Sequence, residues 1–114
     1  MNSSKHGKDG KLKNGLMKEF FRDGRLSCEG KFINGEKTGV WKYYLLNGNV
    51  KAIGNYRAGK MVGDWKWYRE NGKLMQTGSF ENERKTGLWT RYLEDGNLMD
   101  ETEFADGKKV KVKK

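Results

Sequence analysis

The glycines of this chain recur with a fixed period of 24 residues. Two series carry the period: Gly15, Gly39, Gly63 and Gly87, and, nine positions after each, Gly24, Gly48, Gly72 and Gly96. Trp41, Trp65 and Trp89 stand two positions after the last three members of the first series, and Met17 takes that place in the first copy. A period of this length is typical of stacked repeats, in which one unit is too small to bury a face alone. Such a chain usually offers a surface for binding.

The second glycine series predicts one β-hairpin in each repeat. Every member follows an Asp or Asn: Asp23-Gly24, Asn47-Gly48, Asn71-Gly72 and Asp95-Gly96. These dipeptides favour a type I′ turn, which needs positive φ at both central residues. A two-residue loop then sets the pairing of the strands. It predicts Trp41 opposite Gly54, Trp65 opposite Gly78 and Met17 opposite Gly30.

The predicted pairing suggests what the tryptophans do. A large ring opposite a glycine can lie over the bare backbone and shield it. Trp89 faces Thr102 instead, so looser packing is expected there. The predicted structural positions are Trp41, Trp65, Trp89, Gly30, Gly54 and Gly78.

Strict alternation along the strands separates two faces. The tryptophan face is predicted to carry the Trp residues and most of the aliphatic ones, including Leu26, Val50, Leu74 and Leu98, with Cys28 as a buried thiol. The tyrosine face is predicted to be polar with one ring per repeat: Phe20, Tyr44, Tyr68 and Tyr92. A β-bulge would change this assignment. Because a single layer leaves one face open to water, the tryptophan face must either curl on itself or pack against a partner.

Short turns between the hairpins predict one continuous sheet. The fold class is all-β: a single-layer, twisted antiparallel meander of four 24-residue hairpins with about eight strands. The predicted repeats are 15–38, 39–62, 63–86 and 87–107. Residues 1–14 form a basic N-terminal segment that can hold a degenerate half-repeat. The Lys-rich tail 108–114 can add an edge strand whose lysines block aggregation.

Charge is concentrated at the two ends of the chain. The formal net charge is +9, and most of it lies in residues 1–14 and 105–114, whereas 81–106 is acidic. No run approaches the ~18 apolar residues that a membrane-spanning helix requires. The chain is therefore expected to be soluble and cytoplasmic, with the mature part of an exported protein as the open alternative.

Signals for catalysis are missing. The chain has one Cys and one His, which exclude an internal disulfide and a cysteine-based zinc cluster. No phosphate-binding Gly-Lys-Ser/Thr loop and no nucleophile elbow occur. A single sheet also offers little cleft in which a carboxylate could be activated. We therefore expect no enzyme, no cofactor and no metal.

The repeat follows the pattern Gly-x-Trp-x-x-Tyr-x-x-Asn-Gly-x-Leu-x-x-x-Gly-x-Phe, as in residues 63–80. It resembles the MORN repeat, and more closely the bacterial variant found in antitoxin-like proteins, over about residues 10 to 107. Departures are Met17 for Trp, Thr102 for Gly and Glu83 for Gly. The resemblance implies an elongated twisted sheet that serves as a scaffold, an antitoxin or a phospholipid binder.

Two functions from different classes follow. The first is a non-enzymatic module for protein interaction or scaffolding, which binds an unidentified protein or itself; exposed aromatics are favoured anchors. The alternative is peripheral binding of anionic phospholipid through the basic ends and a Lys/Tyr face. Nucleic acid is not the expected partner because the fourth repeat is acidic. The candidate binding residues are Phe20, Tyr44, Tyr68, Tyr92, Lys42 and Lys66.

Overall fold

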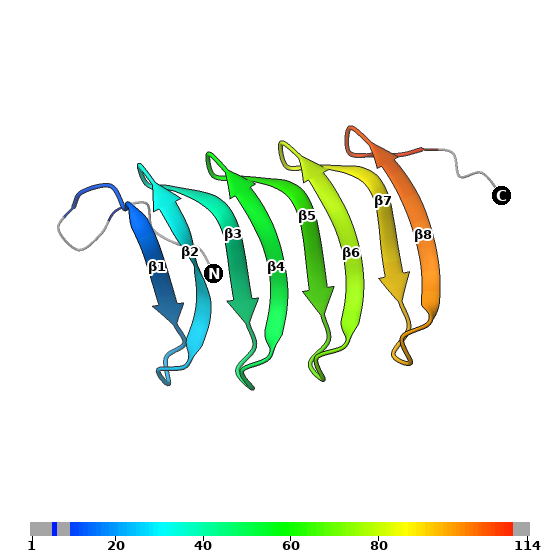
Figure 1. The fold of residues 1–114 in the computed structure, drawn as a ribbon, viewed down its shortest axis with the longest axis horizontal. Helices are drawn as coiled ribbons and strands as arrows, with labels where there is room; N and C mark the ends of the chain where they lie inside the picture. Colours follow the sequence, from blue (N-terminus) through cyan, green and yellow to red (C-terminus); the bar gives the residue numbers. More distant parts are fainter. Residues whose placement is uncertain (1–5, 7–9, 111–114) are drawn as a thin grey trace.

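One open antiparallel sheet makes up the molecule in the computed structural model, which describes residue 6 and residues 10–110 (Figure 1). The order of strands in the sheet is their order in the chain, so each strand pairs only with its neighbours in sequence. The strands are β1 (Gly15–Phe20), β2 (Leu26–Ile33), β3 (Glu36–Tyr44), β4 (Val50–Arg57), β5 (Lys60–Tyr68), β6 (Leu74–Glu81), β7 (Arg84–Tyr92), β8 (Leu98–Ala105) and β9 (Lys108–Lys109). The predicted all-β meander is confirmed.

The sheet is a single layer, with extents of 55 × 32 × 16 Å. Eight strands form the four predicted hairpins, and the two-residue β9 is a ninth strand at the start of the predicted tail. Residues 111–114 of that tail, and most of the predicted half-repeat in 1–14, lie outside the described residues. Within the described part, His6 and Leu12 form an isolated antiparallel bridge.

The turn within each hairpin differs from the prediction. At Asn47-Gly48 only the glycine has positive φ, 89°. The Leu45 N–H donates to the Asn49 carbonyl oxygen at 2.8 Å, which closes a three-residue loop. The Asn47 side chain accepts the Asn49 N–H at 2.9 Å. This side-chain acceptor stabilises a type I turn followed by a left-handed glycine, so the prediction of a type I′ turn here is wrong. Type I′ geometry occurs between the repeats instead, as at Asn34-Gly35 with φ of 49° and 80°.

The register near the tryptophans is nevertheless as predicted. Trp41 pairs with Gly54, and Tyr43 pairs with Ala52. The loop holds one residue more than predicted, but a β-bulge at Lys51 takes up that residue, so that the next pair is Tyr44 with Val50. The two departures therefore cancel in the centre of each hairpin.

The same bulge moves four aliphatic side chains to the other face. Directly paired residues of neighbouring strands lie on one face. The four pairs that follow the bulges are Phe20 with Leu26, Tyr44 with Val50, Tyr68 with Leu74 and Tyr92 with Leu98. The prediction that these aliphatic residues lie on the tryptophan face is wrong, because it assumed strict alternation through the bulge.

Each tryptophan ring covers a glycine of the strand before its own, whereas the predicted partners, Gly54, Gly78 and Thr102, lie on the strand after it. Trp41 is opposite Gly54 in the register, but its indole covers Gly30 of β2, where an added Cβ would stand 2.1 Å from the ring. Trp65 covers Gly54 and Trp89 covers Gly78 in the same way. The cause is a second irregularity, in which β3 places three residues opposite Gly30 and directs the ring toward the preceding hairpin.

Because each ring lies over the preceding strand, its indole N–H can donate a hydrogen bond to a carbonyl oxygen of that strand. Trp41 Nε1–H donates to the Lys31 carbonyl oxygen at 3.1 Å, and Trp65 and Trp89 bond to carbonyls ten residues earlier in the same manner. The expectation of loose packing at Trp89 is wrong, since this residue is only 5% exposed. Thr102 occupies the position in β8 that is equivalent to Gly78, and a tryptophan ring could cover that position only if it were a glycine.

The rings of the tryptophan face pack over one another and over the backbone of the sheet. Trp41, Trp65 and Trp89 are buried although no second layer is present. Each indole lies on bare backbone, and neighbouring rings close over it; the centroids of Phe32 and Trp41 are 5.1 Å apart, edge to face. Edge-to-face pairs of this kind add about 0.5–1.5 kcal/mol beyond their buried area. The sheet therefore has a core within one layer, built between successive repeats.

Candidate interaction surface

Eight side chains form a continuous row on the tyrosine face. We call this row the tyrosine stripe; its members are Phe20, Leu26, Tyr44, Val50, Tyr68, Leu74, Tyr92 and Leu98. Rings on odd-numbered strands alternate with aliphatic side chains on even-numbered strands. All four candidate rings predicted from the sequence therefore lie in one row. The aliphatic members were missed because nothing in the hydrophobic alternation marks the bulge.

No member of the stripe is fully buried, whereas Phe32, Trp41, Trp65 and Trp89 on the tryptophan face are. Phe20 is 55% exposed and Leu98 is 54% exposed, and the other six members are half-buried. A second row of this face adds the large exposed side chains of Leu16, Val40 and Leu88. The tyrosine face thus carries most of the exposed large hydrophobic side chains within the described strands.

Lysines lie beside the stripe in a straight line. Lys18, Lys42 and Lys66 occupy the same position in three successive repeats, two residues before each ring, and all three are exposed. The fourth repeat has the buried Thr90 at this position. The candidate residues Lys42 and Lys66 are therefore brought together with the rings, and Lys18 extends their row.

One ring of the stripe is held by a carboxylate. The Tyr44 hydroxyl donates to Glu29 Oε2 at 2.5 Å. Burial, together with this bond, raises the pKa of Tyr44 to about 12. The ring is therefore fixed in orientation and neutral at physiological pH, whereas no such carboxylate faces Tyr68, because Ile53 takes the place of Glu29 in the next repeat.

Hydrogen bonds to backbone carbonyl oxygens connect neighbouring repeats and keep the side chains of the stripe in line. At the turn edge, the Asn47 and Asn49 side-chain amides both donate to the Glu70 carbonyl oxygen at 2.9 Å, and Arg69 Nη2 donates to the Tyr92 carbonyl oxygen at 2.9 Å. At the opposite edge, the Gly59 N–H donates to the Lys37 carbonyl oxygen at 3.0 Å. Each hairpin is thereby tied to the next at both ends, which spaces the rings regularly.

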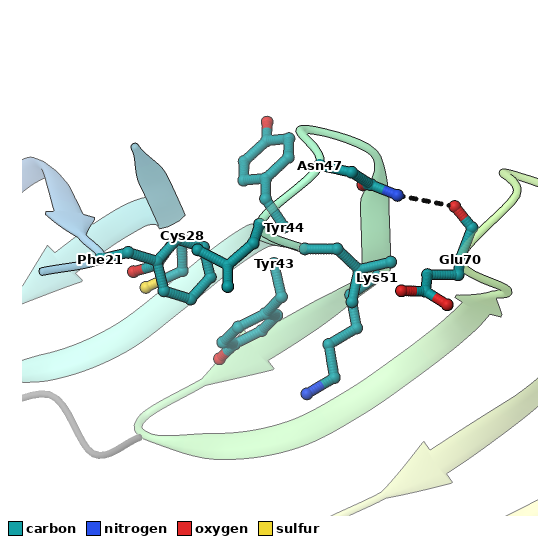
Figure 2. Close-up of a pocket in the computed structure, with 10 residues that line it drawn as sticks. Phe21, Cys28, Tyr43, Tyr44, Asn47, Lys51 and Glu70 are labelled. Carbon is teal, nitrogen blue, oxygen red and sulfur yellow. Dashed lines mark hydrogen bonds between the residues drawn. The ribbon is translucent and has the colours of Figure 1, made fainter. Parts of the chain in front are cut away.

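A pocket of about 510 Å³ opens on the tryptophan face near the turns of the first three hairpins (Figure 2). Phe21, Cys28 and Tyr43 lie on one side of it, and Lys51 and Glu70 lie on the other. The ring of Tyr44 points away from that of Tyr43 (Figure 2). The two rings lie on opposite faces, but Tyr44 also lines the pocket, so the pocket meets the tyrosine stripe at this residue.

Two titratable groups on this side of the sheet, Lys37 and Cys28, are withdrawn from water. Lys37 Nζ lies 4.8 Å from the centre of the Trp41 ring and bonds to the Tyr43 hydroxyl at 3.0 Å. Desolvation lowers the pKa of Lys37. Burial, followed by the charge of Glu19, raises the pKa of the Cys28 thiol, which is 4% exposed. Cys28 is thus a buried thiol, as expected, in surroundings that disfavour the reactive thiolate.

Among residues 6 and 10–110, no three His, Cys, Asp or Glu side chains are grouped closely enough to hold a metal ion. Over the same residues, no helix has the length and apolar character needed to cross a bilayer.

The fold and this surface define a class of protein, the β-hairpin repeat modules that present one open sheet face. The family model described as the MORN repeat variant matches residues 37–58, 61–82 and 85–106, so the chain belongs to this family. Repeats of this family are non-catalytic modules that bind proteins or membranes. The first hairpin, β1–β2, lies outside the matched residues, consistent with Met17 in place of Trp. No curated protein matches the chain.

Proposed function

We propose that this protein is a non-enzymatic scaffold that binds a protein partner through its tyrosine stripe. The observation that carries the proposal is the contrast between the two faces. The tryptophan face fully buries Phe32, Trp41, Trp65 and Trp89, with Trp41 at 0% exposure, whereas the tyrosine face buries none of the rings or aliphatic side chains of the stripe completely. A sheet face of this kind is rimmed by charge and rich in aromatic anchors, which is typical of interaction surfaces.

The size of the stripe supports stable binding. Fully burying one aromatic side chain removes 150–250 Å² from water. Three of the four rings are already half-buried, so a partner can cover about a third of that area on each of them, and the gain is about 1–2 kcal/mol per ring at ~25 cal/mol per Å². The rings and the four aliphatic side chains of the stripe together then offset the entropy cost of association. Because the strands hold the rings in place, little side-chain freedom remains to be lost.

The test uses the triple variant Tyr44→Ser, Tyr68→Ser and Tyr92→Ser as bait in capture from lysate of the source organism. The wild-type protein is expected to retain one protein at high salt, and the variant is expected to lose it. The matched control is Leu93→Ser, because this exposed apolar side chain lies beside a turn and outside the stripe. Retention of the same protein by the triple variant would show that the stripe is not the binding site.

An antitoxin role is the finer form of this proposal. In that case the captured protein would be a toxin, and its toxicity would fall when the wild-type chain is co-expressed. Co-expression of the triple variant would leave the toxicity unchanged. A captured protein without toxicity would support the scaffold role and exclude the antitoxin role.

The line of lysines favours one second candidate, an anionic phospholipid surface. Lys18, Lys42 and Lys66 are exposed beside the rings, and each such cation adds about 1 kcal/mol near an anionic leaflet. Co-sedimentation with phosphatidylserine vesicles at low salt, compared with neutral vesicles, tests this candidate. Replacement of the three lysines with glutamine should abolish sedimentation, and unchanged sedimentation would exclude this face as a lipid-binding surface.

A further inference from the structure

The pocket near the turns of the first three hairpins has the character of a small-molecule site (Figure 2). Its volume of about 510 Å³ lies within the range of about 300–1,000 Å³ that is typical of such sites. Small-molecule sites are mostly apolar, with a few polar groups that fix the orientation of the ligand. Here the apolar wall includes Phe21, Cys28, Tyr43 and Leu45.

We propose that this pocket binds a free aromatic α-amino acid. The aromatic side chain of the ligand lies against Phe21 and Tyr43, and its two charged groups face Lys51 and Glu70. Aromatic rings that pack in this way gain both buried area and a preferred geometry. The inference goes beyond the proposed function, because it assigns a small-molecule ligand to a site that the binding of a protein partner does not require.

One cation and one carboxylate lie on the same side of the pocket. Lys51 and Glu70 line it across from Phe21, Cys28 and Tyr43 (Figure 2). Both side chains are exposed, and within the described part of the chain no ion pair joins them. An α-amino acid carries an ammonium and a carboxylate group on one carbon atom, so it can form a charge-assisted hydrogen bond with each residue at once. A ligand with a single charge would leave one of the two residues without a partner.

Hydrogen bonds hold both sides of the pocket in place. On the aromatic side, the Tyr43 hydroxyl accepts a hydrogen bond from Lys37 Nζ at 3.0 Å, which fixes the ring. On the charged side, the Asn47 and Asn49 side-chain amides both donate to the Glu70 carbonyl oxygen at 2.9 Å, which fixes the backbone that carries the carboxylate. A site that is ordered in advance loses little conformational entropy when a ligand binds.

The residues that line the pocket are not repeated one period later. The counterparts of Cys28, Tyr43 and Lys51 are, in that order, Ala52, Trp67 and Met75. The next repeat therefore has a larger ring on the aromatic side and no cation to receive the carboxylate of a ligand. The combination of an apolar wall, a lysine and a glutamate thus belongs to one place in the array.

The test is isothermal titration calorimetry on the purified full chain, with L-phenylalanine as the probe. The wild type is expected to bind the free amino acid. N-acetyl-L-phenylalanine lacks the ammonium charge and L-phenylalaninamide lacks the carboxylate, so each is expected to bind at least about threefold more weakly. Equal affinity for all three compounds would overturn the assignment of an amino acid to the pocket.

Charge reversals locate the binding site. Lys51→Glu alone and Glu70→Lys alone each set two like charges beside the ligand, and each is expected to weaken binding about tenfold or more. The double variant Lys51→Glu with Glu70→Lys restores one charge of each sign and is expected to bind the amino acid again. The matched controls are Lys60→Glu and Glu94→Lys, which make the same changes at exposed residues outside the pocket and are expected to bind like the wild type.

Two results would overturn the inference. One is a wild-type chain that gives no binding heat with L-phenylalanine and no NMR shift of the Cys28 and Leu45 amides. The other is a pair of single reversals that both bind like the wild type, since binding would then lie elsewhere. Either result leaves the proposed function standing, because the tyrosine stripe is tested by a separate variant.

Discussion

The indole of Trp65 occupies the space that a β-carbon on Gly54 would need, with only 1.9 Å between that position and the ring. The two residues belong to successive repeats, β5 and β4, and the contact recurs between Trp41 and Gly30 and between Trp89 and Gly78. Burial of each ring therefore depends on the absence of a side chain in the preceding hairpin. This dependence makes the stacking of repeats specific in register.

Substitution of Gly54 tests this contact. Gly54→Ala is expected to displace the Trp65 ring and to lower the free energy of unfolding by about 3 kcal/mol, because overpacking of a tight core costs 1–3 kcal/mol and the ring also loses its bond to the Asn55 carbonyl oxygen. The measurement is urea denaturation followed by tryptophan fluorescence.

The control for that experiment is Thr102→Gly, at the equivalent position of β8, where no ring lies over the backbone. This change is expected to cost only about 1 kcal/mol, from lost strand propensity. An equal cost for the two variants would show that ring displacement is not the cause of the first.

Glu83 is held in a conformation that suits glycine. Its φ is 72°, in the left-handed region, at a turn position where the other repeats have Gly35, Gly59 and Gly107. Glu83→Gly is expected to raise the free energy of unfolding by about 1 kcal/mol, because the left-handed conformation costs a residue with a side chain 1–2 kcal/mol. Thermal unfolding measures the gain. Glu83→Ala removes the charge but not the strain, so a gain of the same size in that variant would contradict the explanation.

Asn47 joins two repeats through one side chain. Its Oδ1 accepts the Asn49 N–H within the turn, and its Nδ2 donates to the Glu70 carbonyl oxygen of the next repeat. Asn47→Asp keeps the acceptor and loses the donor, so it is expected to cost about 1 kcal/mol in chemical denaturation. Asp95 already has that side chain in repeat 87–107, where its two carboxylate oxygens accept hydrogen bonds from Asn97 of the same turn. Asp95→Asn is therefore expected to bring no gain in stability, and a large gain there would contradict this account.

Alkaline pH is expected to weaken the sheet through two phenols. Desolvation raises the pKa of both Tyr43 and Tyr56, whose hydroxyls are hydrogen-bonded at 2.8 Å, above the usual value of 10.0. The unfolded chain then releases protons at a lower pH than the folded one. The stabilisation is complete below pH 10 and is lost as pH rises above it.

Titration of tyrosinate absorbance, alongside circular dichroism, checks this expectation. The phenols of Tyr43 and Tyr56 should ionise only as the sheet unfolds. Tyr43→Phe removes one of them, so the variant should lose less stability between pH 10 and the alkaline transition. Ionisation of all five tyrosines before any loss of sheet signal would contradict the burial of these hydroxyls.

Several features of the site were visible in the sequence because they depend only on spacing. The positions of Tyr44, Tyr68 and Tyr92 in successive repeats placed them in one row, and the lysines two residues earlier placed a second row beside it. The aliphatic half of the stripe was assigned to the wrong face. A β-bulge at Lys51 moved Val50 across the sheet, and no residue type in that segment distinguishes a bulge from regular pairing.

The sequence by itself determined the repeat, the hairpins, the central register and the all-β character of the described residues, because these follow from the period of glycines and the alternation of side chains. Tertiary structure alone decided which glycine each tryptophan covers and which face keeps its apolar side chains exposed. The first depends on the irregularity that places three residues of β3 opposite Gly30, and the second depends on the one-residue bulge at Lys51. The energy that selects a bulge comes from contacts between repeats, such as the ring of Trp41 on Gly30, and those contacts exist only after the hairpins have stacked.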